Sequence, residues 1–111
     1  AIAELLHRHS SYRVVVTARS TSLNKLREKF EDDERFWVRP LDVTSSAERE
    51  KLLTEVTNRW QGVNILINCA GISYRSVVEH MTVDDEFKQM EVNYLGPASL
   101  IREVLPAMRE Q

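Results

Sequence analysis

Hydrophobic residues recur along this chain with two spacings that predict alternating helices and strands. Apolar residues three or four positions apart indicate amphipathic helices, and short runs rich in β-branched residues indicate buried strands. The expected elements, in chain order, are a helix at 1–6, a strand at 13–17, a helix at 20–30, a strand at 36–41, a helix at 45–61, a strand at 64–69 and a helix at 83–110. This alternation favours an α/β fold with a parallel sheet and helices on its faces.

Local sequence signals mark the N-terminal ends of two of these helices. Ser45 and Glu48 form a capping box, in which a hydroxyl and a carboxylate pair with main-chain N–H groups. Thr82 precedes an acid-rich first turn that suits the positive end of the helix dipole. The last helix carries an apolar stripe that we expect to face the core. Its members are Val83, Phe87, Met90, Tyr94, Ala98, Ile101, Leu105 and Met108.

Composition excludes several classes of protein. The 111 residues suit one domain, and 15 basic against 17 acidic side chains give a net charge of −2, with no basic stripe for nucleic acid. No apolar run approaches the roughly 20 residues that a membrane span needs. The single cysteine excludes an internal disulfide framework, and no zinc-ligand spacing is present. We expect a cytoplasmic protein without a metal, with a membrane anchor preceding Ala1 as the alternative.

Candidate chemistry lies where the predicted strands end, because ligands of open parallel sheets bind beyond the carboxyl ends of the strands. The three glycines are far apart in sequence, so no glycine-rich phosphate loop is present. The segments after the strands are 18–20, 42–43 and 70–71. They supply a guanidinium, a carboxylate and a bare backbone turn, which suit the phosphate, adenine and ribose of a nucleotide.

Four motifs extend this pattern: Val16-Thr17-Ala18-Arg19, Leu41-Asp42-Val43, Asn68-Cys69-Ala70-Gly71 and Val92-Asn93-Tyr94-Leu95-Gly96. In order and spacing they resemble the short-chain dehydrogenase/reductase family, over essentially the whole chain. The resemblance implies a Rossmann-type doubly wound parallel sheet, partial because the first strand and the C-terminal strands are absent from the chain. It makes residues 1–111 the central part of a single NAD(P)-binding domain. Within the family, residues 70–75 and the Gly96-Pro97 helix resemble the branch that reduces lipid or steroid ketones.

Two parts of the family pattern are not found in this sequence. The glycine-rich pyrophosphate turn is expected just before Ala1, and the Tyr-x-x-x-Lys pair beyond Gln111, because none of the tyrosines here has a lysine four positions later. We therefore expect an internal portion of an oxidoreductase that is inactive by itself. It should not fold stably alone, since a missing first strand leaves a gap of roughly 10 Å, two strand spacings, in the sheet.

Arg19 and Asp42 are the candidate ligands for the adenosine end of a cofactor. Dinucleotide folds that prefer NAD place an acid after the second strand, but Ala18 stands there and no carboxylate follows until Glu28. The guanidinium of the adjacent Arg19 suits a 2′-phosphate. By composition alone, the alternative is that Arg19 is an ordinary exposed arginine in a loop. Asp42 equally suits a turn or a cap. The resemblance implies NADP, with Arg19 on its phosphate, the Asp42 carboxylate accepting from the adenine amino group, and Val43 beside them.

The third strand and the turn after it supply the next candidates. Asn68 lies in an apolar run, where its side-chain amide must find a hydrogen-bond partner. Its ordinary role would be a hydrogen bond that braces neighbouring strands, and the role implied by the resemblance is close to that. Ala70 and Gly71 let the backbone approach the ribose on the nicotinamide side. Cys69, where the family more often has asparagine, is interpreted as a small buried hydrophobe.

Asn93 is the candidate catalytic residue. It precedes Pro97 by four positions, and because proline has no N–H the usual i to i+4 hydrogen bond to the Asn93 carbonyl is not formed. The sequence predicts a kink there, with Gly96 easing the bend. An ordinary kink in a surface helix is the alternative. The resemblance implies a proton relay, in which the Asn93 carbonyl holds a water that leads to the catalytic lysine.

These features together imply an NADP-dependent oxidoreductase that transfers hydride between the nicotinamide and a small-molecule carbonyl or secondary alcohol. The long helix 83–110 resembles the main dimerisation element of the family, which implies a homodimer or homotetramer. The alternative is a non-catalytic nucleotide-binding or regulatory module with the same fold, and a protein-interaction fragment is a third reading. A Tyr-x-x-x-Lys pair within about 60 residues downstream would favour the enzyme.

Overall fold

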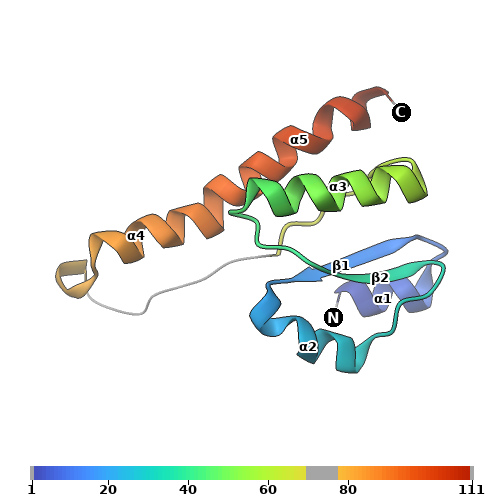
Figure 1. Ribbon diagram of the computed structural model, residues 1–111, viewed down its shortest axis with the longest axis horizontal. Coiled ribbons are helices and arrows are strands. Elements are labelled where there is room, and N and C mark those ends of the chain that lie inside the picture. Colours follow the sequence, from blue (N-terminus) through green and yellow to red (C-terminus); the bar gives the residue numbers. More distant parts are fainter. Residues whose placement is uncertain (1, 70–77, 111) are drawn as a thin grey trace. The chain divides into compact units, whose positions relative to one another are not determined.

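The computed structural model describes residues 2–69 and 78–110, which form two compact units, Ala1–Asp42 and Val43–Gln111 (Figure 1). The first unit contains α1 (Ile2–His9), β1 (Val14–Ala18), α2 (Ser20–Lys29) and β2 (Phe36–Pro40). The second contains α3 (Ser46–Trp60), a 3₁₀ turn η1 (Val78–His80), α4 (Val83–Met90), a π-helical segment η2 (Glu91–Leu95) and α5 (Gly96–Glu110). The predicted alternation of helices and strands is confirmed for the first unit.

A two-stranded parallel sheet forms the centre of the first unit. The register runs from Val14 opposite Phe36 to Ala18 opposite Pro40. Val14, Phe36 and Val38 are its buried core, against which α1 and α2 pack their half-buried apolar residues. A β-branched first strand and an aromatic second strand thus give the unit a small hydrophobic centre, as their sequence pattern predicts.

Side chains from the loop before β2 cover the edge of that strand that faces away from β1. Asp32 accepts a hydrogen bond from the Val38 N–H at 2.9 Å and another from Arg39 Nη1 at 2.6 Å. Burial raises the pKa of Asp32, but these hydrogen bonds outweigh it and hold the pKa below its ordinary value of 3.8. Because an uncovered strand edge invites pairing with other chains, this loop protects the sheet.

Arg35 joins the end of α1 to the start of β2. Its guanidinium donates hydrogen bonds to the main-chain carbonyls of His7, Ser10 and Tyr12, each at 3.1 Å. The last carbonyls of a helix have no partner within the helix, and a cation also interacts favourably with that end of its dipole. Arg35 therefore acts as a side-chain cap for α1.

The capping signals of the second unit are confirmed. The Ser45 hydroxyl accepts from the Glu48 N–H at 3.2 Å at the start of α3, and the Thr82 hydroxyl accepts from the Asp85 N–H at 3.0 Å at the start of α4. After α3 the backbone turns left-handed, with φ values of 69° at Gln61 and 130° at Gly62. Such signals involve only neighbouring residues, which is why the sequence reveals them.

The predicted strand at 64–69 is not formed. These residues have no regular secondary structure, and the side chains of Ile65 and Ile67 are 60% and 49% exposed. A strand exists only where a neighbouring strand completes its hydrogen bonds, and within residues 2–69 and 78–110 the only paired strands are β1 and β2. The apolar run supplies the residue types for a buried strand, but the described chain supplies no neighbour for it.

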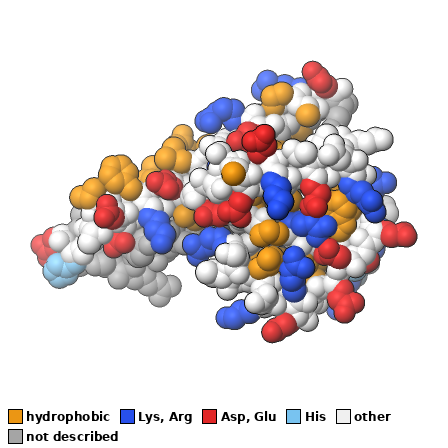
Figure 2. All heavy atoms as spheres, in the orientation of Figure 1, with side chains coloured by type: hydrophobic (Ala, Val, Ile, Leu, Met, Phe, Trp, Pro, Cys, Tyr) orange, Lys and Arg blue, Asp and Glu red, His pale blue; other side chains and the backbone are white. Residues whose placement is uncertain are grey.

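The long helix at 83–110 is confirmed as a succession of α4, η2 and α5, but its predicted core face is wrong. The buried positions are Val92, Gly96, Leu100 and Val104, each four residues from the next. Most of the predicted stripe is exposed, including Phe87 at 65% and Tyr94 at 59%. Figure 2 shows hydrophobic side chains along the outer edge of α4. The segment thus has two apolar faces, and only one packs within its own unit.

Candidate functional site

The carboxyl ends of the two strands meet, as the sequence analysis expects. The Leu41 N–H donates to the Ala18 carbonyl at 2.9 Å, which continues the parallel pairing by one residue beyond β2. Arg19 directly follows the first strand end, and Asp42 directly follows Leu41. A guanidinium and a carboxylate are therefore carried by neighbouring strand ends at one edge of the sheet.

Arg19 occupies the N-cap position of α2 with its side chain exposed. Its backbone is extended, with φ −64° and ψ 155°, and its side chain makes no capping hydrogen bond. The Ser22 N–H donates to the Arg19 carbonyl at 2.9 Å, so the main chain is fixed at the first turn of the helix. A helix N-terminus and a guanidinium both favour an anion. Asp42, by contrast, is half-buried.

Val43 is buried at the start of the second unit and is held from two sides. Arg49 of α3 donates from Nη1 to the Val43 carbonyl at 2.6 Å. On the other side, a Cβ built on Gly96 would lie 2.8 Å from the Val43 carbonyl oxygen and 2.8 Å from its Cγ2. Only a residue without a side chain fits there, so Gly96 permits close packing against Val43, while its predicted role in easing a bend stays a prediction.

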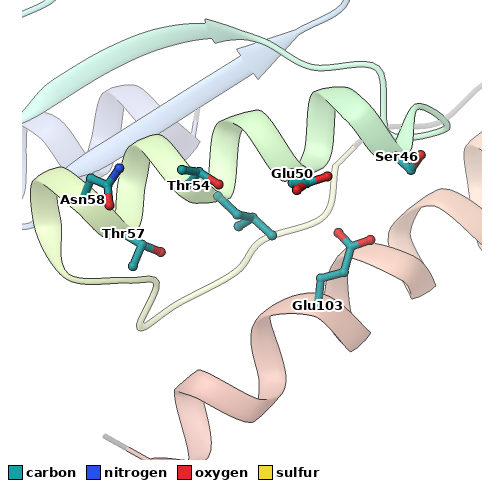
Figure 3. Close-up of a pocket in the computed structure, with 7 residues that line it drawn as sticks. Ser46, Glu50, Thr54, Thr57, Asn58 and Glu103 are labelled. Carbon is teal, nitrogen blue, oxygen red and sulfur yellow. The ribbon is translucent and has the colours of Figure 1, made fainter.

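Arg49 is itself held by α5. Its Nε donates to the two carboxylate oxygens of Glu103, at 3.1 and 3.2 Å. Arg49 is 8% exposed and is the buried charged residue of the described chain. Figure 3 shows the Glu103 carboxylate directed from α5 towards α3. It borders a groove of about 510 Å³ whose other wall is formed by α3, with Ser46, Glu50 and Thr54 among its residues. Of the predicted site residues that the structure describes, none lines this groove.

Asn93 lies in the middle of the π-helical segment. The Gly96 N–H donates to the Glu91 carbonyl, five residues earlier, in place of the usual carbonyl four residues earlier. Pro97 then enters α5 in its first turn, where a missing N–H is tolerated. The helix is irregular around Asn93 and forms a π turn there, a feature that is frequent at functional sites, while the predicted kink stays a prediction.

The remaining predicted residues are not brought into this site by the described structure. Asn68 and Cys69 are exposed, so the expectation of a buried Cys69 and of an Asn68 within a strand is wrong. The reason is that residues 64–69 do not form a strand, so both side chains are open to solvent. Ala70 and Gly71 lie outside the described residues.

Sequence reasoning missed Arg49 and Glu103, although a signal was present. Arg49 stands three, four and seven positions before Leu52, Leu53 and Val56, in line with the apolar face predicted for that helix. A charge aligned with an apolar stripe is buried only when it has a partner. The partner, 54 residues further on, is not identifiable from spacing alone.

The chain shows clear similarity to known proteins. The sequence model of the short chain dehydrogenase family matches residues 1–111. The rat protein named dehydrogenase/reductase SDR family member 7B is 51% identical over 49 residues, which are 44% of this chain and 15% of that protein. Human dehydrogenase/reductase SDR family member 7 is 38% identical over 74 residues, 67% of this chain and 22% of its own length. An oxidoreductase of Staphylococcus aureus is 30% identical over all 111 residues, 48% of its length.

Solved structures of dehydrogenases are also similar to this chain. A short-chain dehydrogenase from Streptomyces avermitilis superposes with a TM-score of 0.83 and 32% identity, over 98% of this chain and 39% of that one. A serine dehydrogenase complexed with NADP⁺ superposes with a TM-score of 0.78 and 26% identity, over 96% of this chain and 42% of that one.

The fold and the matches place this chain in the class of Rossmann-type α/β oxidoreductases. The chain belongs to the short-chain dehydrogenase family. It spans less than half the length of the curated relatives named above. Among residues 2–69 and 78–110, the structure contains no helix with the length and apolar character of a membrane span.

Proposed function

We propose that these residues belong to an NADP-dependent oxidoreductase that transfers hydride between the nicotinamide and a carbonyl or secondary alcohol. The observation that carries the proposal is the placement of Arg19, exposed at the end of β1 beside the strand end that leads to Asp42. The membership of the chain in a family whose members bind nicotinamide cofactors supports it. Residues 1–111 are then the central part of one NAD(P)-binding domain.

The first unit fits the adenosine end of NADP by charge. Arg19 offers a planar, permanently charged guanidinium that can donate paired hydrogen bonds to a 2′-phosphate. Ala18, which precedes it, has no carboxylate to accept from a ribose 2′-hydroxyl or to repel a phosphate. We assign the adenine amino group to the half-buried Asp42 carboxylate, with Val43 as the next residue of the same cofactor segment.

The second unit supplies the proposed catalytic group. In our proposal the main chain at Asn93 orients a water in a proton relay to a lysine. The π turn supports this role, because it changes the hydrogen-bonding register of the helix around Asn93. The bound cofactor supplies the hydride chemistry. We assign Asn68, Ala70 and Gly71 to the nicotinamide side of the cofactor and the proton donor to a Tyr-x-x-x-Lys pair elsewhere in the protein.

Two further features complete the proposal. The exposed stripe on α4, η2 and α5, with Val83, Phe87 and Tyr94 among its members, suits the subunit contact of a homodimer or homotetramer, because a row of exposed large apolar side chains is typical of interaction surfaces. The substrate class is a small-molecule carbonyl or alcohol, and we favour a lipid or steroid ketone from the resemblance of residues 70–75 and of Gly96-Pro97.

The test is a titration of the full-length protein with NADPH and NADH, followed by the fluorescence of the reduced nicotinamide. We expect saturable binding of NADPH and at least tenfold weaker binding of NADH, together with NADPH oxidation when a panel of lipid and steroid ketones is added. Binding of neither cofactor would contradict the proposal. Binding without turnover of any carbonyl or alcohol would favour a regulatory module instead.

A further inference from the structure

The ion pair between the buried Arg49 and the more exposed Glu103 is a feature of the described chain that the proposed function leaves unused. Arg49 lies in the first turn of α3, where the helix dipole is positive, so both its burial and its position disfavour a cation there. An ion pair is weak evidence for stability in either setting, because an exposed pair contributes little and a buried one can often be replaced by well-packed apolar residues without loss. The pair therefore calls for a reason other than stability.

The third contact of Arg49 indicates that reason. While Nε faces Glu103, Nη1 donates to the Val43 carbonyl at 2.6 Å. The planar guanidinium makes both contacts at once in a fixed geometry, which an ammonium group cannot reproduce. Glu103 from α5 therefore sets the orientation of a guanidinium from α3, and that guanidinium sets the position of a carbonyl in the segment before α3.

Fixing the Val43 carbonyl fixes the direction of the chain at that point. The carbonyl shares a rigid peptide plane with the Thr44 N–H, so holding it restricts ψ of Val43. The close approach of Gly96 restricts the other side of the same carbonyl. Val43 is itself one of the residues that we assign to the cofactor, so this restraint acts directly on part of the proposed cofactor segment.

We propose that Arg49, oriented by Glu103, is a positioning residue for Val43 in the proposed adenine-binding segment and raises the affinity of the protein for the adenosine half of its cofactor. This inference rests on the proposed function. Arg49 touches no ligand itself and acts by restraining the segment before binding. Preorganisation of this kind raises affinity because less conformational freedom is lost when the ligand binds.

The test compares variants of the full-length protein. Arg49→Met with Glu103→Leu removes the pair without leaving a buried unpaired charge. Lys51→Met removes one exposed positive charge from the same helix and serves as the matched control. Circular dichroism and thermal melts establish that each variant is folded. The probes are NADPH and adenosine 2′,5′-bisphosphate, the latter measured by displacement of NADPH.

We expect the double variant to be folded and to bind both probes about tenfold more weakly, by the same factor for each. This factor corresponds to the loss of one charge-assisted hydrogen bond. The control should bind within twofold of wild type. A purely structural role would move the melting temperature without moving the affinities measured well below it. Folded double variants with unchanged affinity would overturn the inference while leaving the proposed function intact.

Arg49→Lys keeps the test decisive if the double variant does not fold. The lysine retains the positive charge opposite Glu103 but lacks the second guanidinium nitrogen that donates to the Val43 carbonyl. Both probes should therefore again bind several-fold more weakly. Unchanged affinity of the lysine variant would overturn the inference. If the wild-type protein binds neither NADPH nor NADH, the proposed function fails and the inference fails with it.

Discussion

Gly96 and Val43 approach so closely that a methyl group on the glycine would lie 2.8 Å from the Val43 carbonyl oxygen. Gly96 also donates the hydrogen bond that closes the π turn around Asn93. One residue therefore connects the segment that we assign to adenine with the helix that we assign to the proton relay. The proposed adenine-binding segment and the proposed proton-relay helix are thus joined by a packing contact within the second unit.

Gly96→Ala should destabilise the full-length protein by about 1–3 kcal/mol, because the added methyl group must displace buried backbone. Urea denaturation measures the change in free energy of unfolding. Ser99→Ala, in the next turn of the same helix, should change it by less than about 0.5 kcal/mol. A Gly96→Ala variant as stable as wild type would show that Val43 has room to move.

Asp32 should make stability depend on pH in the acid range. Its pKa is held below 3.8 in the folded protein, against the desolvation that burial imposes, by the Val38 N–H and by Arg39. The carboxylate therefore stabilises the fold at pH values above its ordinary pKa, and this contribution is lost as the pH falls through the lowered folded pKa.

The measurement is the urea midpoint of the full-length protein, as wild type and as Asp32→Asn, between pH 6 and pH 2. Wild type should be the more stable at pH 6, and the difference should shrink below about pH 4. Glu34→Gln, an exposed neighbour, is the control. A difference that stays constant down to pH 2 would mean that the hydrogen bonds to Asp32 do not require its charge.

The exposed apolar stripe predicts the assembly state. Phe87→Glu places a charge on the exposed part of the stripe and should shift the full-length protein towards monomers, as measured by light scattering during size exclusion. Lys88→Glu, at the adjacent exposed position, should leave the mass unchanged. An unchanged mass for Phe87→Glu would place the subunit contact elsewhere.

The 111-residue chain by itself should not unfold cooperatively. Its buried core in the first unit rests on Val14, Phe36 and Val38, while Ile65 and Ile67 are exposed in a segment that forms no strand. Guanidine titration followed by circular dichroism should show a broad, gradual change. A sharp sigmoidal transition would contradict this expectation.

The sequence predicts the features that depend on neighbouring residues and fails where distant residues decide. Ser45 and Thr82 act within one helical turn, so their capping roles follow from the sequence. The run at 64–69 has the composition of a buried strand, but composition does not specify whether a partner strand is present. The helix at 83–110 has two apolar faces, and periodicity alone does not show which of them packs against its own chain.

The candidate site follows the same division. Arg19 and Asp42 were predicted because the ends of parallel strands lie at one edge of a sheet, and the Leu41 to Ala18 hydrogen bond confirms that adjacency. Arg49 was missed because its partners Val43 and Glu103 come from other parts of the fold. The cofactor roles of Arg19 and Asp42 stay predictions, as does that of Asn93.

The most direct test of the account is the ratio of the NADH and NADPH dissociation constants for wild type and Arg19→Ala in the full-length protein. If Arg19 binds the 2′-phosphate, the variant should lose about 10- to 100-fold in NADPH affinity, the equivalent of one to two charge-assisted hydrogen bonds, while NADH affinity stays within twofold. Equal losses for both cofactors, or no loss for NADPH, would contradict the assignment of the adenosine site to the end of β1.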